Sequence, residues 1–180
     1  MKKKTRILLT AYGPFGEVKE NITERIVRDI ERAWAKTDCE LETLVMPVEW
    51  TAAEELLEQR LHESHPDIVL GLGHADSYPA PTIETRYFNN SERADNKGKF
   101  REGGIIKRGG KMFYETNVDV ELLLAQLTKE HIPAVVHGGT EGMNYLCNFA
   151  GYIIARTLHE MNDQKTEFIF IHVPSPKMLP

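Results

Sequence analysis

Cysteines, clusters of basic residues and long apolar runs are all scarce in this 180-residue chain, and each scarcity excludes a class of protein. Only two cysteines occur, Cys39 and Cys147, which excludes a small disulfide-stapled fold and fits a reducing compartment. The net charge is −5 and the basic residues are scattered, which excludes the usual nucleic-acid-binding surface. No apolar stretch has the length of a membrane span, and no signal peptide follows Met1. We expect a cytoplasmic protein without membrane or nucleic-acid partners.

Motifs for bound nucleotides and metals are also missing. Gly71-Leu72-Gly73 lacks the rest of the dinucleotide fingerprint, and no Walker sequence occurs. This weakens the hypothesis of a nucleoside-processing enzyme, which would need a phosphate site. His62 and His65 have a spacing that permits metal ligation, but their place near a predicted helix end favours exposed side chains. We therefore expect no metal ion and no organic cofactor.

The chain does contain a regular alternation of strand and helix patterns. Short apolar runs predict strands at residues 6–11, 41–48, 67–73, 81–88, 134–137 and 166–173. Amphipathic segments predict helices that begin near residues 21, 51, 117 and 145. This order predicts an α/β protein, a three-layer α/β/α sandwich around a largely parallel twisted sheet. We expect residues 1–180 to form a single domain.

Two residues suggest nucleophilic chemistry. Cys147 lies at the start of a predicted helix, after a glycine-containing turn, where unpaired N–H groups and the helix dipole favour a thiolate. His172 lies near the end of the last predicted strand. Ligands of α/β sheets bind beyond the carboxyl ends of the strands, so we expect Tyr12, His74 and His172 to share one rim. A cysteine and a histidine so placed are two parts of a cysteine hydrolase.

The residues alone leave simpler interpretations open. A cysteine in the first turn of an apolar helix is more often a buried small side chain. His172 is also compatible with a hydrogen-bonded core histidine. Glu84 lies inside a predicted strand, where a carboxylate that points into the core needs a partner and one at an edge faces solvent. His137-Gly138-Gly139 is similar to an esterase oxyanion turn, but no Gly-x-Ser-x-Gly sequence accompanies it.

Several ordered motifs at compatible spacings extend over nearly the whole chain. They comprise residues 9–16, 66–67, 73–75, 82–84, 93–98, 145–148 and 170–174, together with Asn21 and Asn89. In combination they resemble the pyroglutamyl-peptidase I family, the pyrrolidone-carboxylate cysteine peptidases. The resemblance implies an α/β/α sandwich and an enzyme that removes an N-terminal pyroglutamyl residue from a peptide. Because relatives are often homo-oligomers, a homo-oligomer is one expected state.

The resemblance also implies roles for particular residues. Cys147, His172 and Glu84 would form a catalytic triad in which Cys147 attacks and an acyl-thioester forms, with Glu84 orienting the His172 ring. The positions expected to bind the substrate are Tyr12, Phe15, His74, Arg93, Tyr145 and Leu146. The chain departs from the family pattern where Gln is usual at His74, Arg at Thr85 and Phe at Tyr12. It also ends soon after His172, so we expect the C-terminal helix of relatives to be absent.

Two other functions remain open. A cysteine hydrolase on the same fold would act on another lactam or N-acyl amide. A catalytically degenerate binding protein would keep the pocket without the chemistry. Substrate profiling separates a hydrolase of another amide from a pyroglutamyl peptidase. The pH dependence of thiol alkylation separates a degenerate binding protein from an active cysteine hydrolase.

Overall fold

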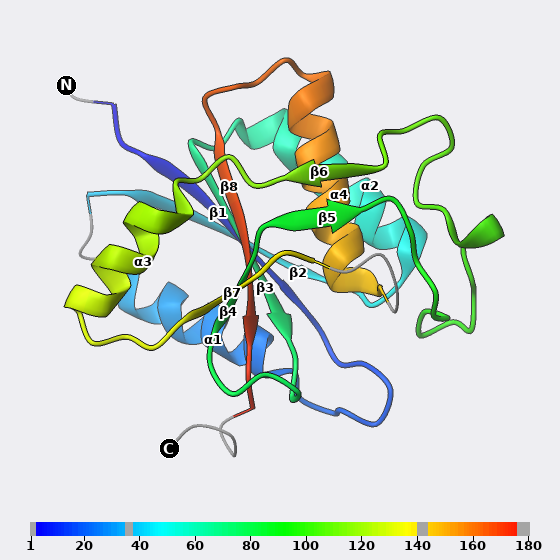
Figure 1. Cartoon of the computed structure of the whole chain (residues 1–180), viewed down its shortest axis with the longest axis horizontal. Helices are drawn as coiled ribbons and strands as arrows, with labels where there is room; N and C mark the ends of the chain where they lie inside the picture. The colour runs from blue at the N-terminus through cyan, green and yellow to red at the C-terminus, as the bar shows by residue number, and fades with distance from the viewer. Residues whose placement is uncertain (1–2, 35–37, 140–143, 176–180) are drawn as a thin grey trace.

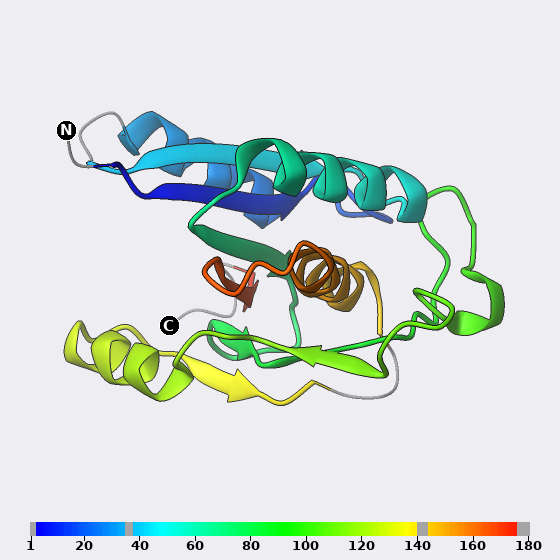
Figure 2. The same cartoon turned by 90° about the horizontal axis from the view of Figure 1, so that it is seen from above.

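The computed structural model describes residues 3–34, 38–139 and 144–175, which form a six-stranded sheet with helices on both faces (Figure 1). In spatial order its strands are β2 (Glu40–Met46), β1 (Arg6–Tyr12), β3 (Ile68–His74), β8 (Glu167–Val173), β4 (Thr82–Glu84) and β7 (Val135–His137). The helices are α1 (Ile22–Ala33), α2 (Trp50–Ser64), α3 (Val120–Lys129) and α4 (Leu146–Glu160). Figures 1 and 2 place α1 and α3 on one side of the sheet and α2 and α4 on the other. The predicted α/β/α sandwich is confirmed.

The sheet is mostly parallel, with one reversal of direction. Strands β2, β1, β3 and β8 run parallel to one another, whereas β4 runs antiparallel to β8 and β7 runs parallel to β4. The last strand in sequence, β8, therefore lies in the interior of the sheet. This arrangement brings side chains of β4 and β7 beside the carboxyl end of β8.

The prediction of one strand over residues 81–88 is wrong. The segment forms two strands in different sheets: β4 belongs to the central sheet, and β5 (Arg86–Phe88) pairs with β6 (Phe113–Glu115) in a separate hairpin-like pair. The break falls at Thr85, whose backbone N–H donates to the His137 carbonyl at 2.9 Å. Sequence patterns do not reveal such a break, because both halves have the same β-prone composition.

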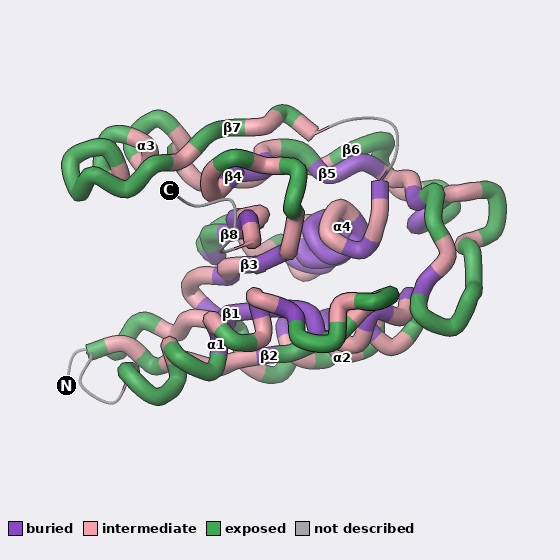
Figure 3. Tube along the Cα trace, turned by 90° about the horizontal axis from the view of Figure 1, so that it is seen from below, coloured by how far each residue is buried: buried purple, intermediate pink, exposed green. Residues whose placement is uncertain are grey.

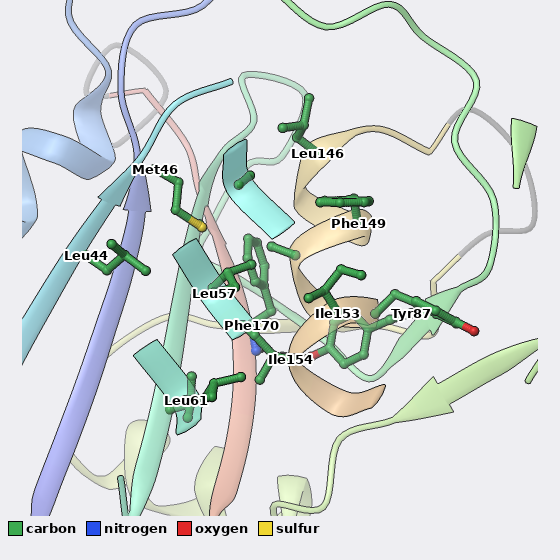
Figure 4. Packing of buried hydrophobic residues seen from close by; sticks show 14 of the residues in the cluster. Leu44, Met46, Leu57, Leu61, Tyr87, Leu146, Phe149, Ile153, Ile154 and Phe170 are labelled. Atoms are coloured by element: carbon green, nitrogen blue, oxygen red, sulfur yellow. Dashed lines mark hydrogen bonds between the residues drawn. The ribbon is translucent and has the colours of Figure 1, made fainter. Parts of the chain in front are cut away.

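The larger core lies between the sheet and helices α2 and α4. Figure 4 shows Leu57 and Leu61 of α2 facing Phe149 and Ile153 of α4, with Phe170 of β8 beneath them. Burying such a side chain contributes about 1.5–3 kcal/mol, so this face supplies much of the stability. A smaller cluster packs α1 against the opposite face. By contrast, α3 has no fully buried residue among its ten and is largely exposed in Figure 3.

The loop that follows β1 is fixed by a helix cap. Asn21 caps α1, its Oδ1 accepting from the Thr23 backbone N–H at 3.0 Å. The Asn21 Nδ2 donates to the Gly13 carbonyl at 3.0 Å, and the whole side chain is buried. The side-chain amide of Asn21 thereby caps the N-terminus of α1 and also holds the loop that contains Phe15.

Within the described residues, no helix combines the length and apolar character needed to span a bilayer. The single-domain organisation stays a prediction. Residues 176–180 lie outside the described part. The expectation that the C-terminal helix of relatives is absent therefore falls on residues that are not described. Residues 140–143, which form part of the glycine-containing turn predicted before Cys147, are also outside it.

Candidate active site

The register of two strands and one helix start brings the predicted triad together. On β8, Phe170 and His172 point to the same face of the sheet, because strand side chains alternate. Glu84 of β4 pairs with Phe170 across the antiparallel ladder and therefore shares that face. Cys147 lies in the first turn of α4, which covers the same face.

The three side chains form a continuous set of contacts. The Nδ1 atom of His172 is 3.0 Å from Oε1 of Glu84, and the Cys147 side chain lies near enough to the His172 ring to raise its pKa. Glu84 is 7 % exposed, so its carboxylate depends on these partners rather than on water. A thiol, an imidazole and a carboxylate in this order have the geometry of a nucleophile, its base and the group that orients the base.

The electrostatics of the site favour an ion pair. Burial lowers the pKa of His172, but the charge and hydrogen bonds of Cys147 and Glu84 outweigh it and raise the pKa to about 10. Burial likewise raises the pKa of Glu84, yet hydrogen bonds from His172 and His137 bring it below its usual value. At neutral pH the ring is therefore an imidazolium and the acid a carboxylate.

A glycine on the neighbouring strand makes room for the sulfur atom. A Cβ atom at Gly73 of β3 would lie 2.6 Å from the Cys147 Sγ and 2.8 Å from the Phe170 Cε1. Both distances are shorter than a carbon atom can approach a sulfur or carbon atom to which it is not bonded. In the Gly71-Leu72-Gly73 sequence, which is weak as a nucleotide motif, Gly73 thus leaves room for the thiol and Gly71 leaves room for the Phe170 ring.

We expect Gly73→Ala to reduce kcat about a hundredfold, because an error of about 1 Å in the position of a reacting atom has that cost. The matched control is Gly138→Ala, since a Cβ atom there meets nothing within 4 Å. Steady-state hydrolysis of a peptide substrate gives kcat, and thermal unfolding verifies that both variants fold. Full activity in the folded Gly73→Ala protein would show that the sulfur position is not critical.

Two polar side chains, the buried Tyr87 and the partly buried Asn148, hold the surrounding backbone, and the sequence patterns did not identify either. The Tyr87 hydroxyl donates to the Glu84 carbonyl at 2.8 Å and accepts from the Phe170 N–H at 3.1 Å. Asn148 accepts from the Phe88 N–H at 2.7 Å and donates to the Phe88 carbonyl at 2.8 Å. These bonds tie β4, β5 and β8 to the start of α4. Asn148 directly follows Cys147 in the sequence, which is the one signal that could have indicated its role.

A pocket of about 420 Å³ opens beside the triad. Four of the predicted substrate-binding residues line it, namely Phe15, His74, Arg93 and Tyr145, as do all three triad residues. The ring of Phe15 contacts that of His74 edge-on with centroids 5.9 Å apart, and the guanidinium of Arg93 lies 6.0 Å from the Tyr145 ring centre. The pocket therefore combines aromatic walls with two arginines, Arg86 and Arg93.

The structure places Tyr12 and Leu146 beneath the pocket. Neither lines it: Tyr12 is 3 % exposed and Leu146 is 2 % exposed, and both belong to the core. The Tyr12 hydroxyl donates to the Leu146 carbonyl at 2.5 Å, which ties the end of β1 to the first turn of α4. Burial, together with nearby Cys147 and Tyr145, raises the pKa of Tyr12 well above its usual value. These contacts support the position of Cys147, and a substrate-binding role for the two residues stays a prediction.

Two further pocket residues contact the triad carboxylate. Nδ1 of His137 lies 2.8 Å from Oε2 of Glu84, and the Tyr78 hydroxyl donates to Oε1 at 3.2 Å. Sequence reasoning treated His137 only as part of a weak esterase-like motif and did not identify Tyr78. Among the described residues, no three His, Cys, Asp or Glu side chains are grouped to hold a metal ion.

The fold and the site together define a class, the α/β proteins in which a thiol, an imidazole and a carboxylate are arranged as in cysteine hydrolases. A family model described as pyroglutamyl peptidase matches residues 5–179. The chain belongs to the pyroglutamyl peptidase family.

Similar proteins agree with this assignment. Pyrrolidone-carboxylate peptidase 1 of Saccharolobus solfataricus is 34 % identical over 93 % of this chain and 78 % of its own length. The pyrrolidone-carboxylate peptidase of Pyrococcus furiosus is 32 % identical over 94 % and 80 %. The crystal structure of the pyrrolidone carboxyl peptidase from Fervidobacterium islandicum AW-1 superposes with a TM-score of 0.85 at 31 % identity, covering 95 % of this chain and 81 % of that one.

Proposed function

We propose that this protein is a cysteine peptidase that removes the pyroglutamyl residue from the N-terminus of a peptide. The observation that carries the proposal is the set of contacts from Glu84 through His172 to Cys147 at the wall of a pocket. Membership in the pyroglutamyl peptidase family supports the same substrate.

In the proposed reaction the Cys147 thiolate attacks the carbonyl carbon of the pyroglutamyl residue. The His172 imidazolium then gives its proton to the leaving amine as the C–N bond breaks, which yields an acyl-thioester. Water, deprotonated by His172, hydrolyses the thioester and frees both pyroglutamate and the thiolate. Glu84 keeps the ring oriented and stabilises its charged form. Backbone N–H groups in the first turn of α4 are suited to stabilise the tetrahedral oxyanion.

Recognition of the lactam ring fits a pocket with aromatic walls. Pyroglutamate is compact and neutral, so ring faces such as Phe15 and Tyr145 suit it better than charges do. The Nε2 of His74 is 2.9 Å from the Asp76 carboxylate, which fixes the ring at the pocket wall. The Nδ1 of the ring is buried and has no hydrogen-bond partner among the described residues. Because the pocket does not reach that nitrogen, we assign recognition of the lactam to the aromatic walls.

The test is a substrate profile with fluorogenic amides. A pyroglutamyl amide should be cleaved, whereas a prolyl amide should not, because its charged ring nitrogen would be buried without a partner. A chelator should leave the activity unchanged.

Each alternative gives a different result in this profile. Preferential cleavage of another lactam or N-acyl amide would replace the pyroglutamyl assignment. No cleavage of any amide, together with an ordinary pH dependence of Cys147 alkylation, would indicate a binding protein. Inhibition by the chelator would indicate metal-dependent chemistry.

The cellular location and the assembly state remain proposals. Both cysteines are free thiols, which suits the reducing cytoplasm. Fractionation of cells that produce the protein checks the location. A homo-oligomer is expected by resemblance, and light scattering of the purified protein measures its mass in solution.

A further inference from the structure

The triad carboxylate contacts two histidines rather than one. Oε1 of Glu84 is 3.0 Å from Nδ1 of His172, and Oε2 is 2.8 Å from Nδ1 of His137. The two imidazoles therefore occupy different oxygens of the same carboxylate. His137 is itself one third exposed and lines the pocket, so it lies between the acid and the substrate space.

Backbone pairing between β4 and β7 places His137 beside Glu84. In the parallel pairing of β4 with β7, Glu84 is opposite His137, so their side chains share one face of the sheet. Thr85, the next residue after Glu84, holds the His137 carbonyl twice, by its N–H at 2.9 Å and by its hydroxyl at 3.2 Å. The contact between His137 and Glu84 is thus fixed by main-chain pairing as well as by the side chains.

A third donor completes the surroundings of the acid. The Tyr78 hydroxyl donates to Oε1 at 3.2 Å, and the Tyr78 ring lies 5.4 Å from the His172 ring and 5.9 Å from the His137 ring. The terminal torsion of a glutamate has broad, shallow minima, so a carboxylate bound at one oxygen still rotates. Donors on both oxygens remove that freedom and keep Oε1 directed at His172.

We propose that His137 is a positioning residue of the reaction: it donates its Nδ1 proton to Oε2 of Glu84 and thereby holds Oε1 against His172. This inference rests on the proposed roles of Cys147, His172 and Glu84. The lowered pKa of Glu84 is consistent with it, because burial alone would raise that pKa and the His172 and His137 hydrogen bonds reverse the effect.

The experiment compares His137→Leu, His137→Asn and the parent protein. Leucine removes the donor, and kcat should fall about tenfold with KM little changed, because a hydrogen bond to a charged group is lost while the substrate contacts remain. Asparagine places its Nδ2 close to the position of Nδ1 and should restore most of kcat. His62→Leu, an exposed histidine in the last turn of α2, is the matched control and should leave kcat unchanged.

Two further measurements separate positioning from a general structural role. In a Glu84→Gln background, His137→Leu should have little additional effect, since its partner charge is already gone. The rate of Cys147 alkylation by iodoacetamide, followed on the peptide that contains it, should fall in His137→Leu and recover in His137→Asn. This readout needs no substrate, so it tests the inference even if the pyroglutamyl assignment fails.

The inference is overturned by any of three results. They are an unchanged kcat and alkylation rate in His137→Leu, a loss that asparagine does not restore, and losses in His137→Leu and Glu84→Gln that add independently. A rise in KM without a change in kcat would instead assign His137 to substrate binding.

Discussion

Replacing Cys147 with alanine should reduce hydrolysis of a pyroglutamyl amide about a millionfold, to the background rate, because the nucleophile of a covalent mechanism is removed. The fold should survive, since Cys147 is only partly buried and alanine is tolerated in a helix. Continuous fluorescence of the released amine gives the rate, and thermal unfolding gives the stability.

The natural control for this variant is Cys39→Ser, which changes the other thiol at the start of β2. It should retain full activity, and iodoacetamide should still inactivate it by modifying Cys147. Substantial turnover by a folded Cys147→Ala protein would remove the thiol from the mechanism. Inactivation of the parent through Cys39 would have the same consequence.

Replacing Glu84 with glutamine should reduce kcat on the order of a thousandfold and change the pH profile. The pKa of His172 is raised to about 10, so the parent should lose activity as pH rises through about 10 and the imidazolium loses its proton. Removing the carboxylate charge lowers that pKa, and the alkaline limb of kcat/KM should move to lower pH. The alkaline limb should not come from Tyr78, because burial and Glu84 raise the pKa of Tyr78 to about 12.

The same shift has a consequence for stability. Folding raises the pKa of His172, so protonation of its ring stabilises the folded protein. This contribution to the free energy of unfolding is complete below the ordinary pKa of about 6.5 and is lost as pH rises towards 10. The parent should therefore unfold more easily across that range, and Glu84→Gln should show a smaller dependence. Glu115→Gln, an exposed carboxylate of β6, is the charge-matched control. An alkaline limb that stays in place in Glu84→Gln would contradict the link between Glu84 and His172.

Local patterns predicted the parts of this protein that depend on local physics. The amphipathic run after Tyr145 predicts a helix, and the apolar run that ends near His172 predicts a strand. The predicted start of α4 and end of β8 therefore lie close to the observed ones. Glu84 was different, because a carboxylate in a short apolar strand reads equally well as an edge residue. Only the resemblance to a family assigned it to the site.

The contacts that were missed depend on long-range pairing. Two three-residue strands carry no signal of direction, so the reversal of β4 and its pairing with β7 could not be read from the sequence. The approach of His137 to Glu84 follows from that pairing alone. The burial of Tyr12 was missed for a related reason: a tyrosine next to a glycine-rich turn fits an exposed pocket wall as well as a core position with a buried partner for its hydroxyl.

The interior position of β8 bears on how the protein is made. Because β3 and β4 flank this final strand, a ribosome-bound or truncated chain that lacks residues 167–173 has a gap through the middle of its sheet and no His172. Neither a closed core nor a reactive thiol can then form. A chain that lacks this strand is therefore expected to have no peptidase activity.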